Sequence, residues 1–283
     1  MELVHTVQDV RDRHEAARAA GKRVGLVPTM GFLHDGHRSL MVAAAAECDV
    51  VTVTIFVNPL QFGPNEDLDA YPRDLEGDLA LAEGAGVSLV FAPSVQEMYP
   101  DGEVLTSVRV RGLADQLEGA SRPGHFDGVA TVVSKLFSIA GPCRAYFGEK
   151  DYQQLQIVTR MARDLSMPVD VVPCATVREP NGLARSSRNA YLSDGEREAA
   201  GVLKRALDAG VAAIEAGERR TDAVERRMAE VVATEPLAGL DYARVVDAAS
   251  LETRDVLNGT VRLLIAARVG PARLIDNVGA VAR

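Results

Sequence analysis

The chain has 283 residues, of which 47% are hydrophobic and 25% charged, a composition typical of globular proteins and too apolar for a disordered or fibrous chain. Its formal net charge is −9, and a surface this acidic repels phosphate backbones, so we expect no nucleic-acid partner. No apolar run reaches the ~20 residues of a membrane span, and residues 1–22 contain no apolar segment typical of a secretory signal, so we expect a cytoplasmic protein with no membrane partner.

The first half of the chain alternates strand-like and helix-like segments. Short apolar or β-branched runs predict strands at residues 23–28, 50–57, 87–92, 145–147 and 169–176. Helical patterns accompany them at residues 7–20, 37–47, 74–83, 129–139 and 152–165. This alternation predicts an α/β fold with a Rossmann-like parallel sheet and helices on both faces, in which ligands bind beyond the carboxyl ends of the strands.

The second half has a different pattern. Two long amphipathic helices are predicted at residues 194–217 and 221–234, followed by strands at 241–247 and 260–268. Pro180, Asn181 and Gly182 interrupt any regular element before them, so we place a boundary near residues 176–181. The sequence thus predicts a Rossmann-like domain at residues 1–176 and a smaller α+β domain at residues 177–283.

The cysteines Cys48, Cys143 and Cys174 are scattered and have no CxxC spacing. This pattern favours small core residues over a disulfide framework or a zinc site.

The stretch of residues 28–39, PTMGFLHDGHRS, is the most informative one for function. A predicted strand ends at Pro28, a loop follows, and a helix is predicted from about His37. His34 and His37 would then lie beside the N–H groups of a helix start, which bind anions and above all phosphate. Two alternatives are a surface turn and a zinc site, and the second lacks a third ligand nearby.

This stretch resembles the HxGH signature of the nucleotidyltransferase superfamily. Further segments narrow the resemblance to the pantothenate synthetase family, the ligases that join pantoate to β-alanine. They are FVNPLQF at 56–62, YPR at 71–73, RPGHFDGV at 122–129, FGEKDYQQ at 147–154 and GLARSSRN at 182–189. HxGH alone does not distinguish such a ligase from a simple nucleotidyltransferase. A nucleotide-binding module without activity is a third hypothesis.

The resemblance implies a two-step reaction on pantoate, β-alanine and ATP. ATP and pantoate give pantoyl adenylate and pyrophosphate, and β-alanine then displaces AMP to give pantothenate. The resemblance also implies Mg²⁺, a homodimer, nucleotide and pantoate binding in the first domain, and a second domain that closes over ATP.

Gln61 and Gln154 are the candidate pantoate-binding residues. A primary amide donates and accepts hydrogen bonds, so a glutamine pair suits a substrate with hydroxyls and a carboxylate, although two solvated glutamines are the alternative. By resemblance these two residues hold pantoate together with Met30, Asn58 and Arg122. RPGHFDGV also contains His125 and Asp127, with either a substrate-proximal or a loop-ordering role.

Lys150 is one of only four lysines in the chain, and an ammonium is a compact cation for the β- and γ-phosphates of ATP. Ser186, Ser187 and Arg188 offer two hydroxyls and a guanidinium, which suit a bound anion. Plain surface charge and an ordinary turn are the respective alternatives. By resemblance these four residues and both histidines are catalytic, and ATP is bound by Pro28, Met30, His37, Gly148, Lys150, Asp151, Val177, Ser186, Ser187 and Arg188.

Asp78 is the candidate Mg²⁺ ligand, because one or two carboxylates usually hold this ion together with phosphates and water. An acid that serves only the helix dipole is the alternative. Members of the family often have adjacent acids here, whereas this chain has Gly77. The chain also departs from the family pattern at Asn181 and Arg185.

Overall fold

The computed structural model describes residues 1–63, 68–69 and 71–283. The chain divides into two compact units. The first comprises Met1–Gly148 and Gln153–Ala175, and the second comprises Glu149–Tyr152 and Thr176–Arg283. The short segment Glu149–Tyr152 therefore belongs with the C-terminal part of the chain, although a further stretch of the first unit follows it.

The first unit contains a six-stranded sheet in the order β1-β4-β3-β2-β5-β6. All of its strand pairs are parallel, which confirms the predicted Rossmann-like architecture. The strands are β1 (Glu2–Val4), β2 (Val24–Thr29), β3 (Val50–Ile55), β4 (Leu89–Phe91), β5 (Cys143–Gly148) and β6 (Val169–Cys174). The sequence pattern did not predict β1, which is a short edge strand.

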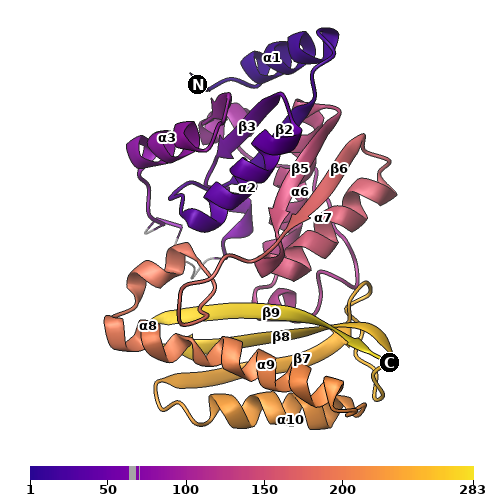
Figure 1. The fold of residues 1–283 in the computed structure, drawn as a ribbon. Helices are drawn as coiled ribbons and strands as arrows, with labels where there is room; N and C mark the ends of the chain where they lie inside the picture. The colour runs from indigo at the N-terminus through magenta and orange to yellow at the C-terminus, as the bar shows by residue number, and fades with distance from the viewer. Residues whose placement is uncertain (64–67, 70) are drawn as a thin grey trace. The chain divides into compact units, whose positions relative to one another are not determined.

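Helices cover both faces of this sheet (Figure 1). Those of the first unit are α1 (Val7–Ala19), α2 (Asp35–Glu47), α3 (Leu75–Gly84), α4 (Val95–Met98), α5 (Glu118–Ser121), α6 (His125–Ala140) and α7 (Tyr152–Asp164), with a 3-10 turn η1 (Pro59–Gln61). Helices α2 and α3 pack together, as do α1 and α6. Apolar side chains of α2 and α3, such as Met41 and Ala82, form one core with Val27 and Val53 of the strands.

The strand order of the sheet reverses between β2 and β5. Strand β3 lies on one side of β2 and β5 on the other. The ladder between β2 and β5 pairs only Gly25 with Arg144 and Leu26 with Ala145, and both strands continue beyond it. A ligand site is expected at the carboxyl ends of these strands, because open parallel sheets bind ligands where the strand order reverses.

The second unit is an antiparallel sheet covered by helices. Strands β7 (Ala238–Asp247), β8 (Gly259–Val269) and β9 (Ala272–Ala282) pack against α9 (Val202–Glu215) and α10 (Thr221–Val232). The remaining elements are α8 (Asp194–Ala200), η2 (Glu149–Asp151) and η3 (Ser187–Tyr191). The α+β prediction is confirmed, but β9 was not predicted.

The prediction of one continuous helix over residues 194–217 is wrong. The structure breaks it at Gly201, which joins α8 to α9. A Cβ at Gly201 would lie 2.7 Å from the Asn181 carbonyl oxygen, so glycine is needed for the close approach of the loop at Asn181.

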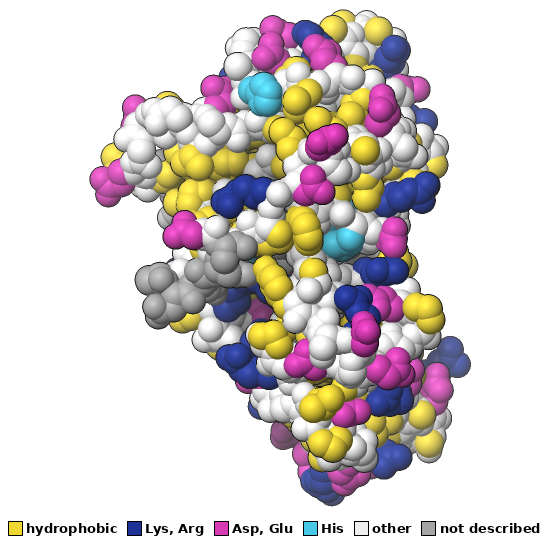
Figure 2. All heavy atoms as spheres, turned by 90° about the vertical axis from the view of Figure 1, so that its left-hand side faces the viewer, with side chains coloured by type: hydrophobic (Ala, Val, Ile, Leu, Met, Phe, Trp, Pro, Cys, Tyr) yellow, Lys and Arg dark blue, Asp and Glu magenta, His cyan; other side chains and the backbone are white. Residues whose placement is uncertain are grey.

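In the described parts of the chain, no helix is both long and apolar enough to cross a bilayer. The face shown in Figure 2 carries interspersed acidic and basic side chains rather than a broad field of one sign. All three cysteines are free thiols, and burial raises the pKa of Cys143 to about 12, so this thiol stays protonated at neutral pH.

Candidate functional site

The histidine pair lies where the loop after β2 enters α2. His34 is the N-cap of the helix, and its Nδ1 accepts a hydrogen bond from the Gly36 N–H over 3.1 Å. The Nδ1 of His37 accepts from the His34 N–H over 3.3 Å, and the two ring centroids lie 4.1 Å apart. The histidines thus form a reciprocal capping box, a role that serine or threonine and glutamate usually fill.

These hydrogen bonds indicate which nitrogen carries the proton in the neutral form of each ring. An Nδ1 that accepts an N–H bond carries no proton, so the neutral imidazole has its proton on Nε2. His34 and His37 therefore each have an Nε2–H donor on the ring edge opposite the capping atom. At the helix start that was predicted to bind phosphate, the Gly36 N–H donates to His34.

Asp78 holds the loop that precedes the histidines. Its side chain is buried on α3, where Oδ2 accepts from the Phe32 N–H over 2.9 Å and Oδ1 from the Leu33 N–H over 2.6 Å. Phe32 has a φ of +49°, a left-handed conformation that is unfavourable for an aromatic residue, and Gly31 before it has +82°. Asp78 thus stabilises a strained turn. Burial raises the pKa of its carboxyl, and the two amide bonds oppose this shift.

A second cluster surrounds Gln61 at the end of η1. The Gln61 Nε2 donates to the Met30 sulfur at 2.9 Å, and its Oε1 accepts from the Asn58 Nδ2 at 3.2 Å. Asn58 and Gln61 are both buried. Three residues that the sequence links to pantoate, Met30, Asn58 and Gln61, are therefore in direct contact.

Tyr99 adds a further hydrogen bond to this cluster. Its hydroxyl donates to the Asn58 Oδ1 over 2.8 Å, and burial raises its pKa to about 12, so it remains a donor at neutral pH. Backbone groups fix the Asn58 amide, because its oxygen accepts from the Leu60 N–H at 3.3 Å and its nitrogen donates to the Gly128 carbonyl at 3.2 Å, so the nitrogen also faces the Gln61 oxygen. The Gln61 nitrogen is then left to donate toward Met30. Tyr99 was missed in the sequence because an isolated tyrosine carries no motif.

Arg122 and His125 fix the backbone of Gln61. The Arg122 guanidinium lies 2.9 Å from the His125 Nε2, and arginine can only donate, so this nitrogen accepts. The His125 proton is then on Nδ1, which donates to the Gln61 carbonyl over 2.8 Å. Both residues therefore order the backbone at Gln61, and the predicted pantoate-binding residue Arg122 lies beside this cluster. A Cβ at Gly128 would lie 2.2 Å from the Leu60 carbonyl oxygen, so this glycine lets α6 approach η1.

The two glutamines at the start of α7 differ. Gln153 is buried, and its amide nitrogen donates to the carbonyls of Leu113 and Gln116 at 2.8 and 2.7 Å. Its oxygen accepts from the Glu118 N–H at 3.0 Å, so Gln153 holds the segment before α5. Gln154, the predicted pantoate ligand, is half-buried and, among the described residues, is not part of the hydrogen-bonded cluster around Gln61.

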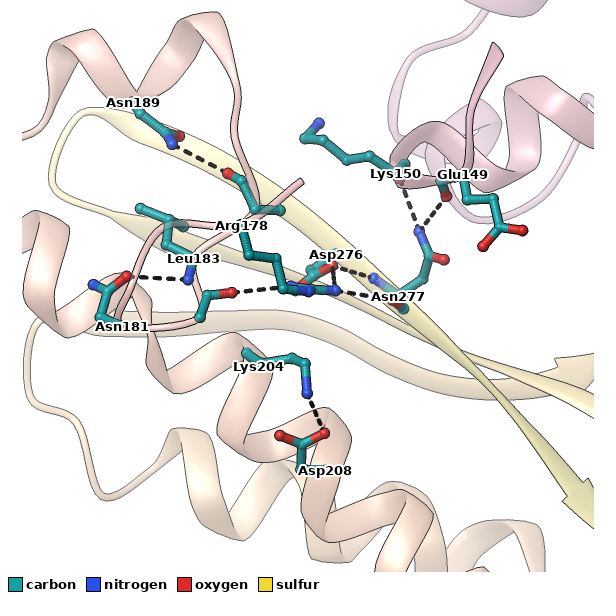
Figure 3. A network of polar contacts seen from close by, with 12 residues as sticks. Glu149, Lys150, Arg178, Asn181, Leu183, Asn189, Lys204, Asp208, Asp276 and Asn277 are labelled. Atoms are coloured by element: carbon teal, nitrogen blue, oxygen red, sulfur yellow. Dashed lines mark hydrogen bonds and ion pairs between the residues drawn. The ribbon is translucent and has the colours of Figure 1, made fainter. Parts of the chain in front are cut away.

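Lys150 and Asp151 belong to the second unit, in η2. The Lys150 side chain is 19% exposed, and its Nζ lies 3.5 Å from an Asp151 carboxylate oxygen. The backbone carbonyl of Lys150 accepts a hydrogen bond from the Asn277 side chain of β9 at 2.8 Å. The predicted phosphate-binding lysine is therefore tied to the C-terminal sheet (Figure 3).

The segment Ser186–Arg188 leads into η3 in the same unit. The Ser186 hydroxyl caps η3 by accepting from the Arg188 N–H at 3.3 Å. Behind it, one oxygen of Glu179 accepts from Arg197 at 2.9 Å and from the Asn189 amide at 3.1 Å. These bonds hold both ends of the predicted phosphate-binding segment.

The departures from the family pattern at Asn181 and Arg185 have structural roles. The Asn181 oxygen accepts from the Leu183 N–H at 3.1 Å, and its amide nitrogen donates to the Arg197 carbonyl at 2.8 Å, which an aspartate cannot do. The Arg185 guanidinium lies 3.7 Å from Glu179. The changes therefore stabilise the turn before Ser186.

The other residues linked to ATP lie at strand ends or in this hairpin. Pro28 and Gly148 are near the carboxyl ends of β2 and β5, at the point where the strand order reverses. The Val177 carbonyl accepts from the Arg185 N–H at 2.9 Å. The predicted ATP-binding residues are thus distributed over both units.

Comparison with known proteins gives a consistent result. The family described as pantoate-beta-alanine ligase matches residues 2–279. A curated pantothenate synthetase from Moorella thermoacetica is 54% identical over 278 residues, which cover 98% of each chain.

Two solved structures are similar as well. The crystal structure of the pantothenate synthetase from Thermus thermophilus has a TM-score of 0.92 and 49% identity, covering 98% of this chain and 99% of that one. The pantoate-beta-alanine ligase from Francisella tularensis, complexed with Beta-gamma ATP and β-alanine, has a TM-score of 0.78 and 34% identity, covering 98% and 97%.

Proposed function

The chain belongs to the pantoate–β-alanine ligase family and joins pantoate to β-alanine at the expense of ATP, and we propose that it does so through pantoyl adenylate. The pantoate carboxylate attacks the α-phosphorus of ATP, and pyrophosphate leaves. The β-alanine amine then attacks the activated carbonyl, loses a proton, and releases AMP. Because the substrate carboxylate is the first nucleophile, the reaction requires no nucleophile from the enzyme.

One observation carries this proposal: the loop after β2 contains both the histidine pair and Met30, which contacts the cluster around Gln61. Met30 in this loop contacts Gln61, and His34 and His37 end it with two Nε2–H donors. This arrangement supports binding of the attacking carboxylate close to donors for the phosphoryl oxygens. Donors fixed in advance stabilise the charge that develops in the transition state.

Residues of the second unit supply the remaining positive charge in this proposal. Lys150 binds the β- and γ-phosphates, and Ser186, Ser187 and Arg188 bind phosphate oxygens as hydroxyl and guanidinium donors. Asp151, Val177 and Gly148 line the nucleotide site in the same proposal.

Mg²⁺ would be held by ATP and Asp78. The described residues contain no cluster of three or more histidine, cysteine or acidic side chains for a metal, but an ATP-bound Mg²⁺ needs only one or two carboxylates. Each Asp78 oxygen accepts one backbone N–H bond and retains a second lone pair, so the carboxylate fits this role. The ion would neutralise phosphate charge.

Replacing Asp78 by asparagine separates its two roles. An amide oxygen is a poorer ligand for a hard cation, so the Mg²⁺ concentration for half-maximal rate should rise. The amide also cannot accept from both the Phe32 and Leu33 N–H groups, so the melting temperature should fall. Rates over a Mg²⁺ titration test the first effect: a lower rate with an unchanged half-maximal concentration would leave Asp78 as a loop-ordering residue alone.

A product assay tests the proposed reaction. Incubation with pantoate, ATP and Mg²⁺ should release pyrophosphate and leave enzyme-bound pantoyl adenylate, detectable by mass spectrometry. Adding β-alanine should release pantothenate and AMP in equal amounts. Formation of ADP and phosphate would contradict the adenylate route.

We also propose that the enzyme is a homodimer, which rests on the family resemblance alone. Light scattering measures the mass in solution, and a mass near the 30.2 kDa of one chain would contradict the dimer.

A further inference from the structure

Two adjacent residues of β9, Asp276 and Asn277, contact the two segments of the second unit that carry predicted phosphate-binding residues. Asn277 binds η2, which contains Lys150, and Asp276 binds Arg178 in the hairpin that leads to Ser186 (Figure 3). Both residues are 3% exposed. No family motif identified in the sequence includes either residue.

Asn277 holds η2 by its backbone. Its Nδ2 donates to the carbonyls of Glu149 and Lys150 at 3.0 and 2.8 Å, and its Oδ1 accepts from the Arg262 Nε at 2.7 Å. Arginine can only donate and a carbonyl can only accept, so the amide has one permitted orientation. These bonds fix the backbone from which the Lys150 side chain extends.

Arg262 of β8, which donates to the Asn277 oxygen, also contacts Glu149 and Tyr152. Its guanidinium carbon lies 4.0 Å from the Tyr152 ring centroid, and its Nη2 donates to the Glu149 carboxylate at 3.1 Å. The Tyr152 hydroxyl donates to the Ala248 carbonyl at 2.9 Å. η2 is therefore bound to the C-terminal sheet on both sides of Lys150.

Asp276 holds the other segment through Arg178. The two residues form a paired hydrogen bond, with Nη1 at 2.6 Å and Nη2 at 2.9 Å from the two carboxylate oxygens. The Arg178 Nη1 also donates to the Gly182 carbonyl at 3.0 Å, across a hairpin in which the Arg185 N–H donates to the Val177 carbonyl. Ser186 follows this hairpin directly. Asp276 also accepts from the Asn277 N–H at 2.7 Å, which links the two anchors.

We propose that Asp276 and Asn277 are positioning residues for adenylate formation, which set Lys150 relative to the Ser186–Arg188 segment. This proposal rests on the function proposed above. If Lys150 binds the β- and γ-phosphates, its position matters in the first half-reaction, in which the bond between the α-phosphorus and pyrophosphate breaks. It does not matter for the attack of β-alanine on pantoyl adenylate, because pyrophosphate has then left. The two half-reactions therefore distinguish positioning from general stability.

The variant Asn277→Asp tests this role. The aspartate has nearly the same shape and can still accept from Arg262, but it cannot donate to the two carbonyls of η2. Pyrophosphate release from ATP and pantoate should fall by roughly 10–100-fold, the scale expected for a misplaced catalytic group. Conversion of supplied pantoyl adenylate and β-alanine should stay at the wild-type rate. Asn258→Asp, the same change at an exposed position of the second unit, should leave both rates unchanged.

Two further variants distinguish a loss of positioning from a folding defect. Asn277→Ala removes the same donors without adding a charge and should show the same split between half-reactions. In a Lys150→Ala background, Asn277→Asp should cause little additional loss of pyrophosphate release, because it acts through Lys150.

The possible outcomes have distinct meanings. Equal losses in both half-reactions, or an undiminished loss in the Lys150→Ala background, would overturn the positioning role. A wild-type enzyme that forms no pyrophosphate would instead overturn the proposed function. A selective loss of the first half-reaction supports both.

Discussion

Replacing His37 by alanine should slow pyrophosphate release from ATP and pantoate by at least ~10²-fold, the usual effect of losing one preorganised donor to a transition state. The imidazole acts mainly on charge that develops during the reaction, so kcat should fall far more than ATP binding weakens. Stopped-flow detection of pyrophosphate measures the step directly. Near-normal release by a folded His37→Ala enzyme would contradict the assignment.

Capping must be separated from catalysis in this variant, because His37 also accepts the His34 N–H. Its loss alone should cost about 1 kcal/mol of stability. His37→Gln provides the control, since glutamine commonly fills this capping position. The glutamine variant should melt near the wild-type temperature and still release pyrophosphate slowly. His5→Ala, at an exposed position, should leave pyrophosphate release unchanged.

Replacing Gln61 by glutamate should raise the KM for pantoate roughly 10–100-fold. The glutamate can still accept from Asn58, but it loses its donor and places a negative charge next to an anionic substrate. Hydrogen bonds that involve charged groups contribute about 1.5–3 kcal/mol, which corresponds to that range. The KM for ATP should change little, and steady-state kinetics with each substrate varied in turn measure the difference.

The matched control is Gln8→Glu, the same chemical change on the exposed surface of α1. It should leave both KM values unchanged. If Gln61→Glu altered the KM values for pantoate and ATP equally, the cluster around Gln61 would not be a pantoate site.

Much of the fold follows from local sequence patterns. Buried parallel strands such as β3 are continuous β-branched runs, and the amphipathic period identifies α1 and α7. The break at Gly201 was not predicted, and the close approach of Asn181, a residue distant in sequence, is evident only in the folded chain. Strand β9 was missed because Asp276 and Asn277 interrupt its apolar pattern, and tertiary contacts make these polar residues favourable there.

The candidate site was predictable where chemistry lies in short motifs. HDGH predicted the histidine pair, and FVNPLQF predicted Asn58 and Gln61, because the residues of each pair lie close together in sequence. The residues that hold these groups escaped prediction. Tyr99, Gln153, Asp276 and Asn277 act through hydrogen bonds to segments far along the chain, so no local pattern reveals them. The sequence singled out Asp78 as a candidate Mg²⁺ ligand but did not reveal its bonds to Phe32 and Leu33.

Isotope transfer from pantoate tests the central claim, that the reaction proceeds through pantoyl adenylate, most directly. Pantoate labelled with ¹⁸O in both carboxylate oxygens is incubated with the enzyme, ATP, Mg²⁺ and β-alanine. Mass spectrometry then measures the label in AMP and in pantothenate. If the carboxylate attacks the α-phosphorus, one labelled oxygen leaves with AMP and the other stays in the pantothenate amide carbonyl. Unlabelled AMP, or label in inorganic phosphate as an acyl phosphate would produce, would contradict the account.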